Sequence, residues 1–404
     1  MVETMRRRGS SKGRALDLIR SQGPISRVEL AEITGLTQAT ISNLVRELLA
    51  DGVVSETGRG ESSGGKPRMR LEINPASRFG VGVDLGADSS TFVVADLAGT
   101  IIGRLGIDGP GALGPADYVR RMADDLAHLL DGLDIDRAAV VGLGIAAPGP
   151  IDREAGVIVG APSLAAWSEF PLTAELSRLT GFSCVLDNDA TAAALGEFWL
   201  GATEVGSTYA SVYMGTGIGA GIVFDGTVYR GSRSNVGELG HVSVDARGPE
   251  CPCGNRGCVE LYAGPHAVIA RAREAAASGG IDLEFTGVAA ADFAAVAEAA
   301  ITGHPLALAL IEDSAEYLAE AIVSLVNIID LDHLVLAGSA FEKVGAIYVR
   351  TIQHIVGERA LSRHLQHVSV RMSVNGTDAA ALGAATMVLQ EQLSPRSLQS
   401  VTLA

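Results

Sequence analysis

The sequence predicts an α/β protein in which a small helical head precedes a larger body made of two similar lobes. Residues 14–53 carry short helical patterns separated by glycines, and residues 80–102 and 210–229 repeat one order of strands and glycine turns. Helical and strand-like runs alternate through the rest of the body, as in α/β proteins. The 404 residues also exceed the size at which a single hydrophobic core usually stops growing.

Three short helices are expected in the head, and each has its own end signals. The first covers Arg14–Ser21, the second Arg27–Thr34 and the third Gln38–Asp51. Ser26 and Glu29 have the spacing of a capping box before and within the second helix. Gly35 then separates the second helix from the third. A helix, a glycine turn and a polar second helix are typical of helix-turn-helix DNA binding.

Candidate DNA contacts lie on the outer face of the third helix and on the hairpin after it. Short polar side chains can reach base edges, whereas cations hold phosphates and position the protein. The residues in question are Gln38, Thr40, Asn43, Arg46, Arg59, Lys66 and Arg68. The hairpin tip is rich in Gly and Ser and would form the wing of a winged helix. The alternative is a small helical interaction domain with solvated polar residues.

Charge is unevenly spread between head and body. Residues 1–72 hold 12 Lys and Arg against 9 Asp and Glu, whereas the whole chain has a net charge of −16. Only the head is therefore a plausible partner for a polyanion. The three arginines Arg6, Arg7 and Arg8 are followed by no apolar run, and the longest uncharged stretch is rich in glycine. We therefore expect neither a secretory signal nor a membrane span, and a cytoplasmic location.

The two repeated segments predict a duplicated fold with a cleft between its lobes. Each runs strand, glycine turn, strand, tight turn, strand. Other helical patterns cover residues 116–130, 189–199, 265–278, 305–329 and 378–389, and other strand-like runs cover 138–146, 183–186 and 333–336.

A cysteine cluster, C-P-C-G-N-R-G-C, places Cys251, Cys253 and Cys258 within eight residues, with His241 ten residues upstream. Closed structural zinc sites take four such ligands, and Cys₃His is one of the usual sets. The alternatives are three reduced surface cysteines, or one disulfide and a spare thiol.

Two glycine turns could cradle phosphates. One contains Gly215, Thr216 and Gly217 between two strands, and the other follows Asp84 and includes Gly86. Neither has the Lys-Ser/Thr ending of a Walker loop. A tight strand connection explains the first turn equally well.

Polar residues around D-N-D-A and G-E-L-G-H could bind a polyol. Asn188 and Asp189 follow a strand and open a helix, where an Asn-Asp pair could grip sugar hydroxyls with Asp189 as a general base. Glu238, His241 and Glu260 add acceptors. The alternatives are a helix cap at Asp187 or Asp189 and solvated charges at the glutamates.

Taken together, these motifs resemble the ROK family of repressors, open reading frames and sugar kinases, over nearly the whole chain. The carrying motif is G-E-L-G-H followed by C-P-C-G-N-R-G-C-V-E. The resemblance implies an actin-like, ribonuclease-H-like body at residues 75–404 after a winged helix-turn-helix at 1–74. It also implies zinc at His241, Cys251, Cys253 and Cys258, and sugar contacts at Asn188, Asp189, Glu238, His241 and Glu260. One ring nitrogen of His241 would face zinc and the other a hydroxyl.

The resemblance is closest to the transcriptional regulators of the family, because the kinases usually lack the head. Kinases show D-x-G-G-T at the first phosphate loop, where this chain has Ala87 and Asp88 in the last two places. At the position of the kinases' nucleotide-side G-G-G motif this chain has Ala337-Gly338-Ser339. At the position of their sugar loop P-N-L it has Pro162-Ser163-Leu164. The resemblance implies a nucleotide site at Asp84, Gly86, Gly215, Thr216, Gly217 and Gly338, and these departures count against phosphate binding there.

We accordingly expect a DNA-binding repressor of carbohydrate metabolism that responds to a sugar. Its expected partners are operator DNA, a sugar effector and further copies of itself in a dimer or tetramer. The rival function is an ATP- and Mg²⁺-dependent sugar kinase with Asp189 as catalytic base. A third alternative is a body that docks a partner and binds no small ligand.

Overall fold

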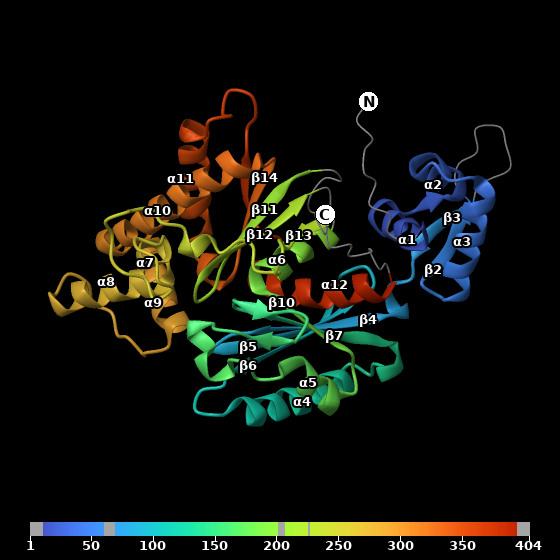
Figure 1. Cartoon of the computed structure of the whole chain (residues 1–404), viewed down its shortest axis with the longest axis horizontal. Coiled ribbons are helices and arrows are strands. Elements are labelled where there is room, and N and C mark those ends of the chain that lie inside the picture. The colour runs from blue at the N-terminus through green and yellow to red at the C-terminus, as the bar shows by residue number, and fades with distance from the viewer. Residues whose placement is uncertain (1–10, 60–68, 201–206, 225–226, 394–404) are drawn as a thin grey trace.

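The computed structural model describes residues 11–59, 69–200, 207–224 and 227–393 (Figure 1). The head consists of three helices and a three-stranded sheet of order β1-β3-β2. Its elements are α1 (Ser11–Gln22), β1 (Ile25–Ser26), α2 (Arg27–Thr34), α3 (Gln38–Ala50), β2 (Val54–Arg59) and β3 (Met69–Ile73). The three predicted helices are confirmed, with ends that differ by at most three residues.

Local sequence explains the turn between α2 and α3. The Ser26 hydroxyl accepts a hydrogen bond from Glu29 N, and Ser26 N donates to Glu29 Oε2 at 2.7 Å, so the predicted capping box is present. Gly35 ends α2 in the left-handed conformation, with φ of 69°. The Thr37 hydroxyl then caps α3 by accepting from Thr40 N.

The first lobe of the body is a five-stranded sheet of order β10-β7-β4-β5-β6 with helices on its faces. Its elements are β4 (Phe79–Leu85), β5 (Ser89–Asp96), β6 (Ile101–Asp108), α4 (Pro115–Gly132), β7 (Val140–Ala147), β8 (Ile151–Asp152), β9 (Val157–Ile158), α5 (Leu172–Thr180), β10 (Cys184–Asn188) and α6 (Asp189–Trp199). Helices α4 and α5 pack together against the sheet, on the face away from the second lobe (Figure 1).

The second lobe has a sheet of order β13-β12-β11-β14-β15. Its elements are β11 (Tyr209–Met214), β12 (Ile218–Phe224), β13 (Thr227–Tyr229), α7 (Glu260–Ala263), α8 (Pro265–Ala277), α9 (Ala289–Ile301), α10 (Pro305–Ile329), β14 (His333–Ala337), α11 (Gly345–Arg359), β15 (Ser369–Met372) and α12 (Ala379–Leu393). Each lobe thus has three antiparallel strands followed by two parallel ones in the same spatial order, which confirms the predicted duplication.

Helices α6 and α12 pack against each other and against the two sheets, α6 on β11 and β12 and α12 on β4, β5 and β7 (Figure 1). Their contacts run backbone to backbone at glycines. A Cβ placed on Gly383 of α12 would lie 1.7 Å from the carbonyl oxygen of Ala192 in α6. One on Gly144 of β7 would lie 2.0 Å from the carbonyl oxygen of Ala384 in α12. These approaches require glycine, and they leave no side chain between the packed elements.

The apolar core of the head continues into the body. Ala15, Leu16 and Ile19 of α1 share one buried cluster with Trp199 at the end of α6 and Leu389 near the end of α12. The head therefore packs on the body through the ends of both central helices.

Some helices were not predicted. The missed ones are α5, α7, α9 and α11. Helix α9 is mostly alanine, so its sequence has little contrast between a polar and an apolar face. No single helix of the described residues is long and apolar enough to cross a membrane. The bent pair α9 and α10, at 111° to each other, meets that test by length and composition alone.

Candidate sugar site and metal centre

The predicted sugar contacts begin at the junction of β10 and α6. Asn188 caps the helix, because its Oδ1 accepts a 3.2 Å hydrogen bond from Thr191 N. The sequence suggested Asp187 or Asp189 for the cap. Asp187 is instead fully buried and accepts a 2.8 Å hydrogen bond from Arg230 Nε. The amide group of Asn188 keeps Nδ2 for another partner, since the cap uses only its oxygen.

Asp189 is the first residue of α6, and its Oδ1 accepts from Ala190 N at 2.7 Å. Burial first, and then the charges of Asp84 and Glu238, raise the pKa of Asp189 to about 7. This carboxyl group therefore changes its protonation state near neutral pH, and its capacity to act as a general base or to accept a hydrogen bond from a sugar changes with it.

Glu238 and Asn188 converge on Gly149, which follows β7. A Cβ at Gly149 would lie 2.9 Å from Glu238 Oε1 and 3.3 Å from Asn188 Nδ2. Asn235, which the sequence did not single out, holds the loop that carries Glu238 in place. Its Oδ1 accepts from Ile151 N at 2.9 Å, and its Nδ2 donates to Ile151 O at 3.0 Å. A side-chain clamp of this kind has no sequence pattern that would reveal it.

Glu260 opens α7 and faces the turn before β12. Its Oε2 accepts from Ile218 N at 2.9 Å, and a Cβ on Gly217 or on Gly240 would lie within 2.9 Å of the same oxygen. The burial of Glu238 raises its own pKa, and the charge of Glu260 adds to this effect, whereas His241 lowers the pKa of Glu238. Like Asn188 and Asp189, these residues are half-buried, so the solvated-charge alternative does not describe them.

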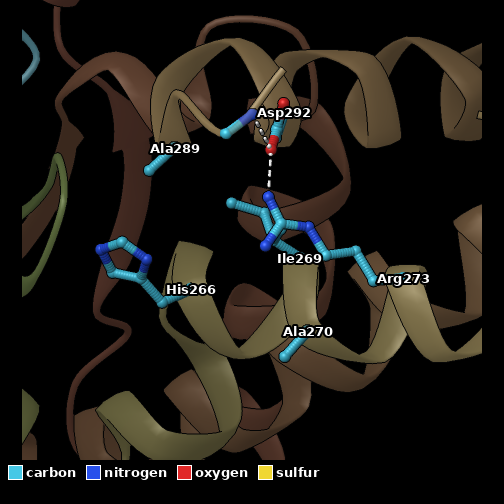
Figure 2. A pocket seen from close by; sticks show the side chains of 7 residues that line it. His266, Ile269, Ala270, Arg273, Ala289 and Asp292 are labelled. Carbon is cyan, nitrogen blue, oxygen red and sulfur yellow. Dashed lines mark hydrogen bonds and ion pairs between the residues drawn. The ribbon is translucent and has the colours of Figure 1, made fainter. Parts of the chain in front are cut away.

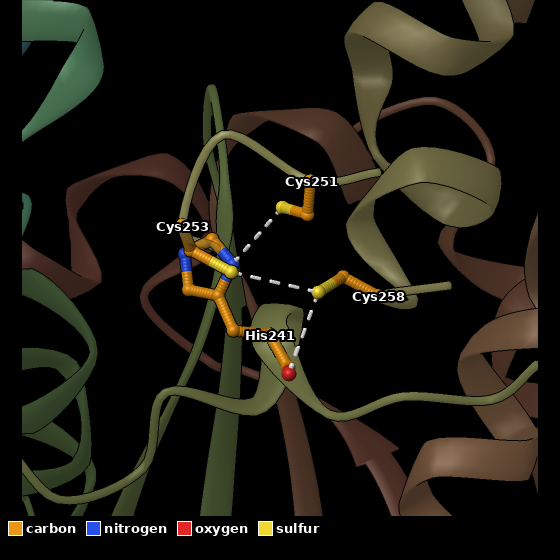
Figure 3. A group of neighbouring side chains, drawn as sticks. All are labelled: His241, Cys251, Cys253 and Cys258. Atoms are coloured by element: carbon orange, nitrogen blue, oxygen red, sulfur yellow. Dashed lines mark hydrogen bonds between the residues drawn. The ribbon is translucent and has the colours of Figure 1, made fainter. Parts of the chain in front are cut away.

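His241 and the three cysteines gather as predicted (Figure 3). Their ligand atoms lie within 4.8 Å of one another, and the Sγ atoms of Cys253 and Cys258 are 3.7 Å apart. Two thiolates on one tetrahedral zinc ion lie about 3.8 Å apart, given Zn–S bonds of about 2.3 Å. Cys251 and Cys258 are buried and no disulfide is formed, so the cluster is not a set of surface thiols.

The donor set fits a soft, thiol-binding cation. In the protein alone, burial and the two neighbouring thiols raise the pKa of Cys258 to about 12. A bound cation would reverse this effect by stabilising the thiolate. His241 Nδ1 lies on the side of the cysteines, 3.7 Å from Cys251 Sγ, which leaves Nε2 for another partner. Gly257, with φ of 59°, shapes the cysteine loop, because a Cβ there would lie 1.8 Å from Asp245 O.

The end of β4 and the turn after it, which resemble a phosphate loop, make hydrogen bonds between the two lobes. The Tyr213 hydroxyl donates a 2.8 Å hydrogen bond to Asp84 Oδ2, and burial raises the pKa of Asp84 to about 6. Asp88 Oδ2 accepts a 3.2 Å hydrogen bond from Ala290 N at the start of α9. Asp88, for which the resemblance to the kinases implies a hydroxyl residue, is thus bound to the other lobe. Tyr213 and Ala290 were missed because both contacts join residues more than 120 positions apart.

The remaining residues of the implied nucleotide site form tight turns. Gly86 N donates to Ser89 O, and Gly215 N donates to Gly217 O across Thr216. Gly338, with φ of 108°, packs on the end of β11, since a Cβ there would lie 2.4 Å from Met214 O. These contacts agree with the strand-connection alternative.

The predicted DNA contacts of α3 lie on its exposed face. Gln38, Thr40, Asn43 and Arg46 are exposed, whereas Ile41, Val45 and Leu48 of the same helix are buried. Arg46 donates to Asn43 Oδ1 at 3.1 Å. Arg59 ends β2, and Lys66 and Arg68 lie outside the described residues.

A cavity that the sequence did not indicate lies between α8 and α9 (Figure 2). Its volume is about 130 Å³, and His266, Arg273 and Asp292 line it. Both carboxylate oxygens of Asp292 already accept hydrogen bonds within the protein, from Arg273, from Thr286 and from Gly287 N. The cavity is small beside pockets that hold sugars or nucleotides.

Comparisons with known proteins agree with this architecture. The ROK family matches residues 80–391, and a winged helix-turn-helix DNA-binding family matches residues 11–55. The chain is 31% identical over 377 residues to a putative xylose repressor of Caldicellulosiruptor sp. (strain Rt8B.4), covering 92% of this chain and 93% of that protein. It is 32% identical over 311 residues to a glucokinase of Thermotoga maritima, covering 76% of this chain and 96% of the glucokinase.

A solved structure resembles the chain from head to body. It is a ROK family transcriptional regulator described as a homologue of the E. coli MLC protein, with a TM-score of 0.77 and 26% identity over 94% of this chain and 95% of that one. The fold and the exposed recognition helix thus define a DNA-binding transcriptional regulator with a sugar-kinase-like body. The chain belongs to the ROK family.

Proposed function

We propose that this protein is a sugar-responsive repressor whose head binds operator DNA and whose body senses the sugar. The observation that carries the proposal is the convergence of Asn188 Nδ2 and Glu238 Oε1 on Gly149, in a chain that also presents an exposed recognition helix. One amide donor and one carboxylate acceptor are the groups that fix vicinal hydroxyls. A protein that binds operator DNA must share a compartment with that DNA, and we therefore infer that this protein is cytoplasmic.

The sugar is held, in this proposal, by Asn188, Asp189, Glu238, His241 and Glu260. Asp189 and Glu238 accept from hydroxyls, and Asn188 Nδ2 donates to one. Relatives named for xylose make D-xylose the first sugar to test, followed by D-glucose from the glucokinase match and N-acetyl-D-glucosamine.

Zinc is the metal we infer for His241, Cys251, Cys253 and Cys258. Bound zinc would supply structural cross-linking of the cysteine loop. His241 Nδ1 would be its ligand, which fixes the ring so that Nε2 is directed to a sugar hydroxyl. The metal would thus keep His241 and the neighbouring Glu238 in position for the sugar.

We further propose that residues 1–74 form the DNA-binding head, that residues 75–404 form the sugar-sensing body, and that two or more copies act together. A single winged helix reads few base pairs, so two heads on two half-sites would supply the specificity of an operator. Gln38, Thr40 and Asn43 would read bases, and Arg46, Arg59, Lys66 and Arg68 would hold phosphates. Analytical ultracentrifugation of the free protein and of its DNA complex tests the copy number.

The test of the main proposal is operator affinity with and without sugar. A duplex is selected from a random library with the sugar-free, zinc-loaded protein, and its affinity is measured by fluorescence anisotropy. We expect D-xylose or another sugar of the panel to weaken binding at least tenfold, and L-xylose to leave it unchanged. Asp189→Asn should bind the duplex normally and ignore the sugar. DNA binding that no sugar alters would contradict the proposal.

The kinase alternative makes a different prediction for the same preparation. A kinase would release ADP with one sugar of the panel, and Asp189→Asn would abolish that release. We expect no turnover, because Asp88 is bound to Ala290 N and Asp84 to Tyr213, so neither carboxylate is free to position a phosphate or its metal. Calorimetry separates the third alternative, since a body that only docks partners would bind no sugar.

A further inference from the structure

One helix links the candidate sugar site to the DNA-binding head. Helix α6 begins at Asp189, directly after its cap Asn188, and ends at Trp199. Eleven residues at 1.5 Å each make it about 16 Å long. The proposed sugar ligands Asn188 and Asp189 therefore lie at the start of α6, and the buried Trp199 lies at its end.

The head binds the far end of this helix through Arg20 of α1. The Arg20 guanidinium lies 4.1 Å from the centre of the Trp199 ring, and its Nη1 donates to the Trp199 carbonyl oxygen. A cation at the carboxyl end of a helix is favoured by the helix dipole, and a guanidinium over an indole adds a cation–π attraction. Trp199 is only 2% exposed and packs in the same apolar cluster as Leu16 and Ile19 of the head.

The close backbone packing of α6 on β12 and α12 makes it a stiff element that resists bending. A Cβ on Gly221 of β12 would lie 2.2 Å from the carbonyl oxygen of Ala190, and one on Gly383 of α12 would lie 1.7 Å from the carbonyl oxygen of Ala192. Near its end, buried Glu197 accepts hydrogen bonds from Ser373 and from Asn375 Nδ2, in the segment that leads into α12. A shift at Asn188 therefore reaches Trp199 as a movement of the whole helix.

We propose that the Arg20–Trp199 contact is the coupling that converts sugar binding into a change of head position. This inference rests on the proposed function and names the residues that transmit it. The sugar favours one position of α6 by binding Asn188 and Asp189, and α6 carries Trp199 with it. Arg20 follows Trp199, so the recognition helix α3 changes its placement relative to the partner copy's head. A ligand can shift such an equilibrium only through its different affinity for the two states.

The deciding variant is Arg20→Gln, which keeps the length of the side chain and removes the charged fork. We expect it to bind D-xylose, or D-glucose if that is the effector, within about twofold of the unmodified protein by calorimetry. Its sugar-free operator affinity should persist, while the tenfold or greater weakening by sugar falls to less than twofold. Arg20→Lys, which keeps the cation, should restore part of the response.

The matched control is Arg14→Gln on the same helix, since Arg14 is an exposed arginine of α1. It should change operator affinity equally with and without sugar, if at all. A spectroscopic arm uses the fact that the chain has two tryptophans. In a Trp167→Phe background, Trp199 is the only fluorophore of this kind, and its emission should shift on addition of the sugar. Arg20→Gln should keep a sugar-induced shift of Trp199 emission, because α6 still moves, while operator affinity no longer follows it.

The outcomes separate the two proposals. If the unmodified protein responds to sugar and Arg20→Gln responds equally, the coupling role is overturned and the sensor remains. If Trp199 emission stays constant while sugar releases the operator, the coupling role is likewise overturned. If no sugar of the panel changes operator binding by the unmodified protein, the proposed function fails, and this inference fails with it.

Discussion

The Tyr213 hydroxyl on the second lobe donates a 2.8 Å hydrogen bond to the Asp84 carboxylate on the first. Asp88, four residues further on, is bound to the second lobe as well, at Ala290 N. The motif that resembles a phosphate loop therefore holds the lobes together directly. In a kinase the corresponding groups would be needed for phosphate and its metal ion.

These contacts predict that Asp88→Ala weakens sugar binding although Asp88 is not a proposed sugar ligand. Asn188 of the first lobe and Glu238 of the second converge on Gly149, and the Asp88 bond between the lobes favours the arrangement that brings them together. Hydrogen bonds to charged groups contribute about 1.5–3 kcal/mol, so a loss of about tenfold in affinity is expected. Calorimetric titration with the effector sugar measures it. Asp124→Ala, an exposed aspartate of α4, serves as control, and equal affinities in both variants would contradict the prediction.

The raised pKa of Asp189 predicts a pH-dependent stability that Asp189→Asn removes. Between the ordinary pKa of an aspartate and about 7, the unfolded chain releases this proton and the folded protein keeps it. Stability therefore falls as pH rises through that window. At pH 8 the variant should melt about 2–6 °C above the unmodified protein, and the two should be close at pH 4. Calorimetric scans across this range test the sign; a variant less stable at pH 8 would contradict it.

Removal of one thiol should affect both the metal and the sugar. Cys253→Ser leaves three of the four inferred zinc ligands, so we expect loss of bound zinc by elemental analysis. His241 and its neighbour Glu238 would then lose their fixed positions, and sugar affinity should fall at least tenfold. Cys184→Ser is the matched control, because Cys184 is a half-buried thiol outside the cluster. Full zinc content and normal sugar affinity in Cys253→Ser would rule out the structural role.

The recognition helix gives a prediction that separates specificity from affinity. Asn43→Ala should relax the sequence preference at one base pair of each half-site, at a cost of about 1–3 kcal/mol for the selected duplex. Arg46→Gln should weaken binding to all duplexes alike and lower the slope of affinity against salt by about one per head. Anisotropy titrations at several salt concentrations distinguish the two. The opposite assignment of the two effects would show that Arg46 reads the base and Asn43 the backbone.

Local signals made the head and the central helix predictable from sequence. The capping box at Ser26 and Glu29 begins α2 and Gly35 ends it, both through short-range hydrogen bonds, and the structure has both ends where the sequence predicts them. Helix α6 has the predicted bounds, because the polar residues before it and the alanines within it leave little choice. The cysteine cluster was predictable for the same reason, since its ligands lie within 18 residues.

Long-range contacts were not predictable in this way. Nothing in the neighbourhood of Tyr213 indicates that its hydroxyl meets Asp84, and nothing around Arg20 indicates a partner 179 residues away. Asn235 likewise clamps Ile151 through backbone groups that every residue has. Such pairs depend on how the two lobes and the head come together, which the pattern of any one segment does not contain.

The position of α12 has a consequence for synthesis of the chain on the ribosome. Strands β4 and β7 of the first lobe are covered on one face by residues 379–393, which are translated some 230 residues after β7. The contacts among the head's own helices and strands are local and can form early, whereas Trp199 and Leu389 join the apolar cluster of the head only later. A nascent or truncated chain would therefore carry a folded DNA-binding head before its sensory body is complete. Chain termination upstream of α12 is expected to yield fragments that occupy DNA and cannot be released by sugar.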